Sequence, residues 1–180
     1  MSQPEKMEHS VNVMQRPRIE KAVLNISVGQ SGEPLQRAVR VLKDLTGLTP
    51  SNRLAKNSIR DWGIHRNEPI ACLVTLRNDA AIDFLKKAFD AVGNRLRQSS
   101  FDLNGNFAFG ISKHIDISGV RYDPDLGIIG MDISVAIGKP GYRVKRKRIR
   151  KAKVGKKQKL TREESIEYVR DVFGIEILGE

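Results

Sequence analysis

Residues 143–159 contain eleven lysines and arginines and no carboxylate. A block of like charge repels itself and does not pack into a core, so the segment is predicted to be a solvated arm that binds a polyanion. Nucleic acid is the favoured partner, because bridging to phosphates releases condensed counterions. A solubilising or localisation segment is the alternative, whereas the low apolar content disfavours binding to a membrane surface. The cations of this basic arm are Arg143, Lys145, Arg146, Lys147, Arg148, Arg150, Lys151, Lys153, Lys156, Lys157 and Lys159.

The excess positive charge is confined to the basic arm. The 180 residues include 32 basic and 21 acidic side chains, for a formal net charge of +11. Removing the eleven cations of the arm leaves 21 basic against 21 acidic residues, so the rest is formally neutral. A hydrophobic content of 39% is typical of a globular protein. We expect a single domain, residues 1–180, with the arm 143–159 inserted within it.

Catalytic and metal-binding residues are not predicted. The three histidines have no serine or cysteine partner at a recognised spacing, and there is no glycine-rich phosphate loop. His114 and Asp116 could form an oriented base on one face of a strand, but a structural hydrogen bond is the favoured interpretation. The single cysteine, Cys72, excludes an internal disulfide, argues against a zinc site, and is interpreted as a small core residue. We therefore expect a protein without enzymatic activity, cofactor or metal.

Two phenylalanines in "GNFAFG" could contact bases. Phe107 and Phe109 are spaced like the alternating aromatic residues of an RNA-binding strand. The basic residue that precedes the first glycine of that motif is absent here. Packing in the core or in a loop is therefore the favoured role for both rings.

Several strands are predicted to have one apolar face and one face that carries polar side chains. In the first, Ala22, Leu24 and Ile26 alternate with a more polar set that includes Lys21 and Asn25. In "IACLVTLR" the apolar side chains likewise alternate with a face that carries Thr75 and Arg77. The predicted strands span residues 19–28, 50–55, 70–77 and 127–138.

Helices with one apolar face alternate with these strands. The first is expected to bury Leu35, Ala38, Val39, Leu42 and Leu45. The second is expected to be capped by Asn78 and Asp79 and to bury Ile82, Leu85, Phe89, Val92 and Leu96. Thr161 and Glu164 form a capping box for a last helix. The pattern predicts an α+β fold, with a mixed, mainly antiparallel sheet, helices packed on one face and the other face open.

A membrane location is not expected. No apolar run approaches the roughly 20 residues that are needed to span a bilayer. The N-terminal residues lack the apolar centre of a signal peptide. We therefore expect a cytoplasmic protein.

Several distinctive blocks occur in one order along the chain: "PRIEKAVLNISVG", "LTGLTP", "IRDWGIHRNEPIACLVTLR", "NGNFAFGISKHIDI" and "YDPDLGIIGMDISVAIGKPG". Together they closely resemble the fifth protein of the large ribosomal subunit, a 5S rRNA-binding family. The resemblance runs from about Met14 to the last helix. The long basic arm and the "RNEPIA" and "GKPG" segments are similar to the archaeal and eukaryotic branch, and the compact size favours archaea.

The resemblance implies a structural, non-enzymatic protein in the central protuberance of the large ribosomal subunit, in the cytoplasm. Its partners would be 5S rRNA, large-subunit rRNA, the peptidyl-site tRNA, and neighbouring ribosomal proteins of the protuberance and of the small-subunit head. Asn25, Thr75 and Trp62 match family positions that contact 5S rRNA. Lys21 and Arg77 would add charge on the same face. The family has a glutamine where this chain has Leu48, whose side chain cannot make the corresponding hydrogen bond.

The loop 56–67 matches the family loop that reaches the peptidyl-site tRNA. An ordinary exposed loop is the alternative interpretation, because a few basic residues are common on any surface. For the whole chain, the alternative is a free-standing regulatory RNA-binding protein that acts in translation or RNA processing. The residues expected to contact tRNA are Lys56, Asn57, Ser58, Arg60, His65 and Arg66.

Overall fold

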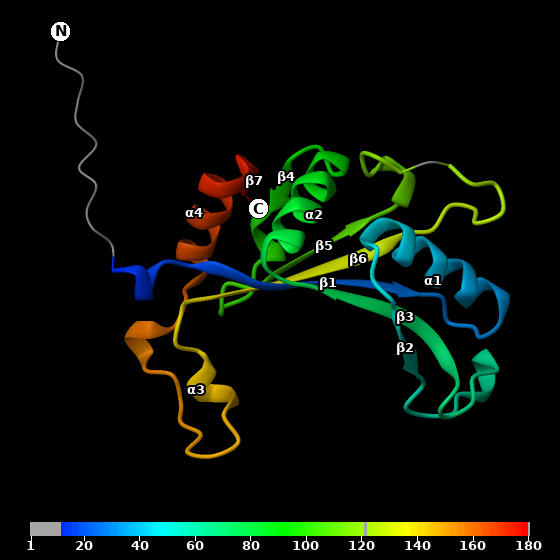
Figure 1. Ribbon diagram of the computed structural model, residues 1–180, viewed down its shortest axis with the longest axis horizontal. Coiled ribbons are helices and arrows are strands. Elements are labelled where there is room, and N and C mark those ends of the chain that lie inside the picture. Colours follow the sequence, from blue (N-terminus) through cyan, green and yellow to red (C-terminus); the bar gives the residue numbers. More distant parts are fainter. Residues whose placement is uncertain (1–11, 121, 180) are drawn as a thin grey trace, which may run out of the picture.

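A five-stranded antiparallel sheet, in the order β2-β3-β1-β6-β5, forms the centre of the protein (Figure 1). This computed structural model describes residues 12–120 and 122–179. Four of these strands follow the predicted segments, although the fourth predicted strand begins later, at Met131, and β5 was not predicted. The bounds of the five strands are β1 Arg18–Ser27, β2 Ser51–Leu54, β3 Pro69–Leu76, β5 Phe107–Ile111 and β6 Met131–Gly138.

The alternation predicted for the first strand is confirmed in β1. Ala22, Leu24 and Ile26 are buried, whereas Lys21 and Asn25 are half exposed. Buried alternate side chains on β3 and β6, including Cys72 and Ile133, extend the same apolar surface. One face of the sheet therefore belongs to the core.

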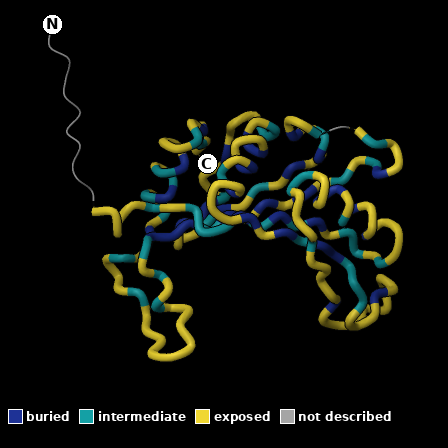
Figure 2. Tube along the Cα trace, in the orientation of Figure 1, coloured by how far each residue is buried: buried dark blue, intermediate teal, exposed yellow. Residues whose placement is uncertain are grey.

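Three helices cover this apolar face, and the α+β class is confirmed. Figure 1 shows α1, α2 and α4 on one side of the sheet, and Figure 2 shows the buried residues gathered between the two layers. Within the described ranges, no helix is long and apolar enough to cross a membrane. The bounds are α1 Glu33–Thr46, α2 Asn78–Ala91 and α4 Arg162–Phe173.

The prediction for the second helix was wrong at both ends. Arg77 is the N-cap residue and makes no side-chain capping bond, while Asn78 adopts a left-handed conformation with φ of 54°. The helix ends at Ala91, so Leu96 is buried from strand β4, Arg95–Arg97. This strand pairs in parallel with β7, Glu176–Leu178, from the far end of the chain. The helix stops locally, where Gly93 and Asn94 adopt left-handed conformations and their backbone N–H groups bond to the Asp90 and Phe89 carbonyl oxygens.

Phe107, Phe109 and His114, for which the sequence left a binding or catalytic role open, pack in the interior. Phe107 is buried and Phe109 half buried, and both stack near Phe89, which confirms a packing role. His114 lies in a short 3-10 helix rather than on a strand, and its Nδ1 accepts from the Ile129 backbone N–H at 3.3 Å. A structural hydrogen bond is therefore confirmed for His114.

Cys72 and the capping box of the last helix match their predictions. Cys72 is fully buried, and burial raises the pKa of its thiol to about 11. Because the thiolate is the nucleophilic form, this side chain is inert at neutral pH. In α4, the Thr161 side chain accepts from the Glu164 backbone N–H, and the Glu164 carboxylate accepts from the Thr161 N–H.

Candidate nucleic-acid interface

The second face of the sheet is not covered by α1, α2 or α4 (Figure 1). Its outward positions include short polar side chains. Thr75, Val23 and Ser134 form one row across β3, β1 and β6 through the strand register. The next row contains Asn25, with Leu73 and Asp132 on either side of it. The register therefore brings Asn25 and Thr75 together as diagonal neighbours on this open face.

Hydrogen-bonding groups on the open face remain available to a ligand. The Asn25 amide donates to Ser27 Oγ at 2.9 Å, which leaves its carbonyl oxygen as an acceptor and one N–H as a donor. Thr75 is exposed. Because both side chains stand on paired strands, their positions are fixed before any ligand binds.

Two predicted cations lie at one end of the open face. Lys21 is opposite Ala136 in the register of β1 and β6 and is half exposed. Arg77 directly follows β3, and its Nη1 donates to the Glu20 carbonyl oxygen at 3.4 Å. The position that departs from the family pattern, Leu48, lies just beyond α1 with an exposed side chain.

The loop between β2 and β3 projects from the open-face side of the sheet (Figure 1). Backbone hydrogen bonds of 2.9 and 3.1 Å join Ile59 and Ile64, and Gly63 makes the turn with φ of 64°. Ile64 is buried beneath the loop. The loop is therefore an ordered projection whose short helix, Arg60–Trp62, lies at the turn.

Most of the predicted tRNA-contact side chains are exposed on this loop. Lys56, Asn57, Arg60, His65 and Arg66 are accessible to a partner. Ser58 is also exposed, but its hydroxyl accepts from the Arg66 N–H at 2.9 Å and so supports the loop internally.

Trp62 lies in the same loop, with 71% of its surface exposed. The structure therefore does not bring Trp62 together with Asn25 and Thr75 on the strands. An aromatic ring exposed this far is available for stacking on a base.

Glu68 fixes the base of the loop. Its carboxylate accepts from the His65 backbone N–H at 2.9 Å and from the Ser31 hydroxyl. The hydrogen bond from His65 has the largest effect, followed by that from Ser31. Both favour the charged carboxylate and so lower the pKa of Glu68. This role was not predicted from the sequence, because Ser31 is 37 residues away along the chain.

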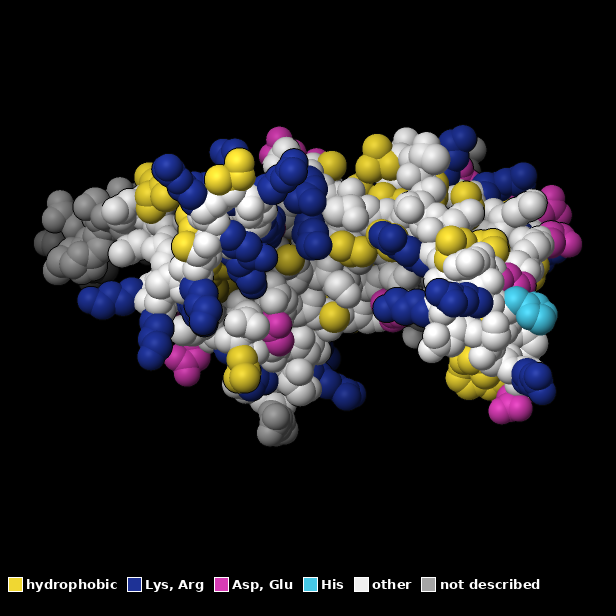
Figure 3. Space-filling view, turned by 90° about the horizontal axis from the view of Figure 1, so that it is seen from below, with side chains coloured by type: hydrophobic (Ala, Val, Ile, Leu, Met, Phe, Trp, Pro, Cys, Tyr) yellow, Lys and Arg dark blue, Asp and Glu magenta, His cyan; other side chains and the backbone are white. Residues whose placement is uncertain are grey.

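The basic arm projects from the same side as the loop, at the other end of the sheet (Figure 1). It contains the short helices Arg143–Arg146 (α3) and Lys156–Gln158. Figure 3, viewed from this side, shows lysine and arginine side chains gathered over both ends of the face. The open face is therefore flanked by two projections with basic side chains.

Hydrogen bonds join the two ends of the arm. Tyr142 Oη accepts from the Leu160 N–H at 2.8 Å and donates to the Gln158 carbonyl oxygen at 3.1 Å. The Gln158 amide donates to the carbonyl oxygens of Met14 and Pro140, at 2.7 and 3.1 Å. Sequence patterns gave no signal for these contacts, since each joins segments that are far apart in the chain.

Charged side chains also hold the arm against the sheet. Arg146 pairs with Glu20 of β1, whose side chain is only 13% exposed. Just before the arm, Lys139 is buried and pairs with Glu164 of α4 at 2.7 Å. Arg146 is the arm cation that forms an ion pair within the described residues, and all eleven arm cations are exposed.

The arrangement suits binding rather than catalysis. Across residues 12–120 and 122–179, no group of three or more histidine, cysteine, aspartate or glutamate side chains could hold a metal ion. The groups that converge on the open side are amides, hydroxyls and cations, which are the groups that contact phosphate and sugar.

Comparisons with known proteins agree with this geometry. Residues 12–65 match the family model described as ribosomal protein L5, and residues 69–168 match the model for the C-terminus of the same ribosomal family. Large ribosomal subunit protein uL5 of Pyrobaculum aerophilum is 53% identical over 164 residues, which cover 91% of this chain and 92% of that protein. The protein of the same name from Aeropyrum pernix is 50% identical, over 90% of this chain and 85% of that protein. The protein of this name from Methanosphaera stadtmanae is 45% identical, over 93% of this chain and 99% of that protein. This chain therefore belongs to the ribosomal protein L5 family, in its archaeal form.

Proposed function

We propose that this chain is a structural component of the large ribosomal subunit that binds 5S rRNA with the open face of its sheet. As a member of a ribosomal protein family it is non-enzymatic and works within a ribonucleoprotein. The observation that carries the 5S proposal is the uncovered polar face on which the register places Asn25 beside Thr75. By this contact the protein anchors 5S rRNA in the central protuberance.

The chemistry of the face suits a folded RNA. Asn25 and Thr75 can each donate and accept hydrogen bonds, and a rigid sheet holds them at a fixed spacing. Sugar hydroxyls and phosphates of an RNA surface present matching groups at fixed positions. Lys21 and Arg77 supply positive charge at the end of the face. The face thus recognises RNA shape.

The ordered β2–β3 loop is the proposed contact to peptidyl-site tRNA and the small-subunit head. Arg60 and Arg66 are exposed there, and the Ile59–Ile64 backbone bonds keep the loop extended away from the sheet. Exposed Trp62 can add a stacking contact to RNA. The basic arm at the opposite end is the proposed contact to large-subunit rRNA.

Binding of 5S rRNA by variants of the open face tests the proposal. Asn25→Ala and Thr75→Val should each weaken binding by about 1–2 kcal/mol, because each leaves a buried RNA partner without its hydrogen bond. Filter binding at fixed salt measures the change. Gln36→Ala, an exposed position on the helical side, is the matched control. Wild-type affinity in both face variants would refute the assignment of this face.

Cosedimentation separates the ribosomal role from a regulatory one. A structural component should occur with large subunits at a ratio near one to one after washing at moderate salt. A protein found mainly outside the subunits, at a small fraction of their number, would instead be a free-standing regulator of translation or RNA processing.

A further inference from the structure

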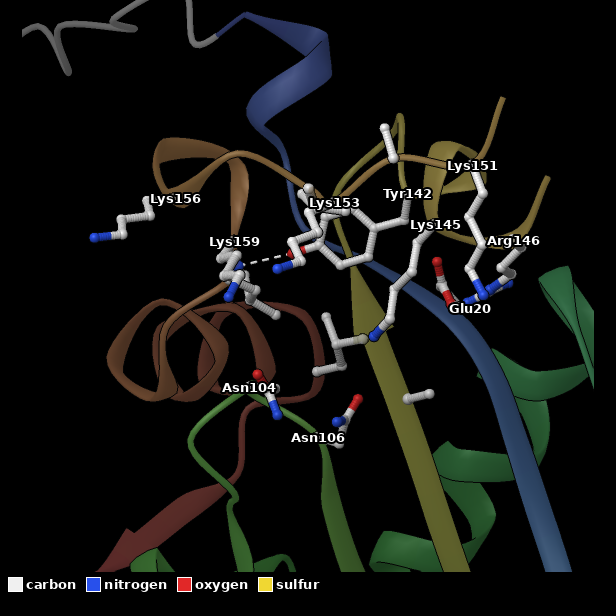
Figure 4. Close-up of a pocket in the computed structure, with 15 residues that line it drawn as sticks. Glu20, Asn104, Asn106, Tyr142, Lys145, Arg146, Lys151, Lys153, Lys156 and Lys159 are labelled. Carbon is white, nitrogen blue, oxygen red and sulfur yellow. Dashed lines mark hydrogen bonds and ion pairs between the residues drawn. The ribbon is translucent and has the colours of Figure 1, made fainter. Parts of the chain in front are cut away.

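A cavity of about 980 Å³ lies between the basic arm, strand β6 and the loop before β5 (Figure 4). Its volume is at the upper end of the roughly 300–1,000 Å³ of typical small-ligand sites. The arm forms one wall, and Asn104 and Asn106 form the opposite one. Lys145 reaches across from the arm towards Asn106 (Figure 4). The cavity exists only because the arm folds back along the sheet.

The lining combines an apolar surface with a cationic rim. Ala136, Ile137 and Leu160 provide apolar surface, and the ring of Tyr142 adds an aromatic wall. Among the described residues, Glu20 is the one acidic side chain that lines the cavity, and it is paired with Arg146. Lysines that contribute to the rim are Lys145, Lys151, Lys153, Lys156 and Lys159.

The asparagine wall is fixed in place by the fold. The Asp102 carboxylate accepts from the backbone N–H groups of Asn104 and Asn106, at 2.8 Å each, and from the Asn106 amide at 2.9 Å. A Cβ on Gly105 would lie 2.7 Å from Leu160, so only glycine allows the loop to pack this closely. The Ser165 hydroxyl also donates to the Gly105 carbonyl oxygen, at 2.5 Å.

Polar groups on this wall remain free for a ligand. The Asn106 carbonyl oxygen can still accept a hydrogen bond while its amide nitrogen donates to Asp102. The Asn104 side chain has no partner within the described residues, so it can both donate and accept. An amide that does both matches the edge of a nucleobase.

We propose that this cavity, the arm pocket, binds one unstacked nucleotide of the rRNA. The base lies against the Tyr142 ring and the apolar lining, the asparagines bond to its edge, and the lysine rim contacts its phosphate and those beside it. The inference rests on the proposed rRNA-binding function and adds a preference for unpaired residues. A paired, stacked base cannot enter a cavity, whereas a bulged one can.

The test uses two RNA hairpins that differ only in one bulged nucleotide, measured with the full chain by fluorescence anisotropy at fixed salt. Charge alone predicts nearly equal affinity, because the two RNAs differ by one phosphate. The arm pocket predicts about tenfold tighter binding of the bulged hairpin, as expected for one base stacked on an aromatic ring. Tyr142→Leu and Asn104→Ala should each reduce this preference severalfold.

Two control variants separate the pocket from other effects. Arg148 lies on the arm outside the cavity, so Arg148→Gln should weaken both hairpins alike and keep their ratio. Tyr142→Phe keeps the ring but removes the hydroxyl that joins the ends of the arm, and it should largely retain the preference. Loss of the preference in Tyr142→Phe to the same extent as in Tyr142→Leu would overturn the stacking role.

The outcomes distinguish this inference from the function on which it rests. Equal binding of the two hairpins by the wild type, with 5S rRNA still bound, would overturn the arm pocket and leave the ribosomal role intact. A preference that survives both Tyr142→Leu and Asn104→Ala would also overturn it. Failure to bind either hairpin or any rRNA would overturn both proposals.

Discussion

Neutralising the basic arm should flatten the salt dependence of rRNA binding. Of its eleven cations, Arg146 is paired with Glu20 and helps to hold the arm on the sheet. The variant therefore replaces the other ten by glutamine and keeps Arg146, Tyr142 and Gln158. Because the hydrogen bonds at the base of the arm are retained, the fold should be unchanged.

The size of the effect follows from the number of phosphates that are neutralised. Each contributes about 0.7–0.9 to the slope of log affinity against log salt. If five of the ten cations contact phosphates, the slope falls by roughly 3.5–4.5. A fourfold increase in salt would then weaken wild-type binding by roughly two to three orders of magnitude more than it weakens the variant.

The assay is a salt titration of both proteins on 5S rRNA and on a fragment of the large rRNA. Lys86→Gln with Lys87→Gln, two exposed positions on helix α2, is the control and should leave the slope nearly unchanged. The same slope for wild type and variant on both RNAs would refute the reasoning, and the charge of the arm would then need a protein or tRNA partner.

Three further predictions concern the loop and the last helix. The double variant Arg60→Ala, Arg66→Ala should change 5S affinity by less than about 0.5 kcal/mol but lower tRNA occupancy of the peptidyl site, measured on purified ribosomes. If the variant instead lost 5S binding and kept normal tRNA occupancy, the roles proposed for the loop and the sheet would have to be exchanged. Since the pKa of Glu68 is lowered by folding, its charged form stabilises the native state above pH 4.5, and the stabilisation is lost as the pH falls through the lowered pKa. The difference in Tm between wild type and Glu68→Gln should therefore be largest near neutral pH and vanish in acid, and a pH-independent difference would contradict this. Glu164→Ala removes half of the capping box and the partner of buried Lys139, so chemical denaturation should show a loss of about 2–3 kcal/mol, whereas wild-type stability would argue against both contacts.

Local patterns in the sequence were sufficient where the determinants are close together in the chain. The alternation around Leu24 and Asn25 predicted which face of β1 is buried, because side chains of a strand alternate regardless of its neighbours. The capping box of Thr161 and Glu164 was predicted for the same reason, since both residues belong to one helical turn. The excess of charge in residues 143–159 likewise depends on composition alone.

Three features were missed or misplaced. Leu96 was assigned to a helix because its spacing fitted the helical period, but pairing with Ile177 makes it part of a strand. Asn78 has the side chain of a capping residue, yet its backbone adopts a left-handed conformation at the start of α2. Trp62 was grouped with the sheet contacts, although the chain turns at Gly63 and carries the ring out on the loop.

The sequence by itself determined the polar character of one sheet face, the existence of a basic arm and the family to which the chain belongs. Tertiary structure alone decided that Asn25 and Thr75 are neighbours, that the arm returns to the sheet through Tyr142 and Leu160, and that a cavity forms beneath it. Strand register and side-chain packing join residues that are dozens of positions apart, and the free energy of such contacts depends on the whole fold rather than on any local period.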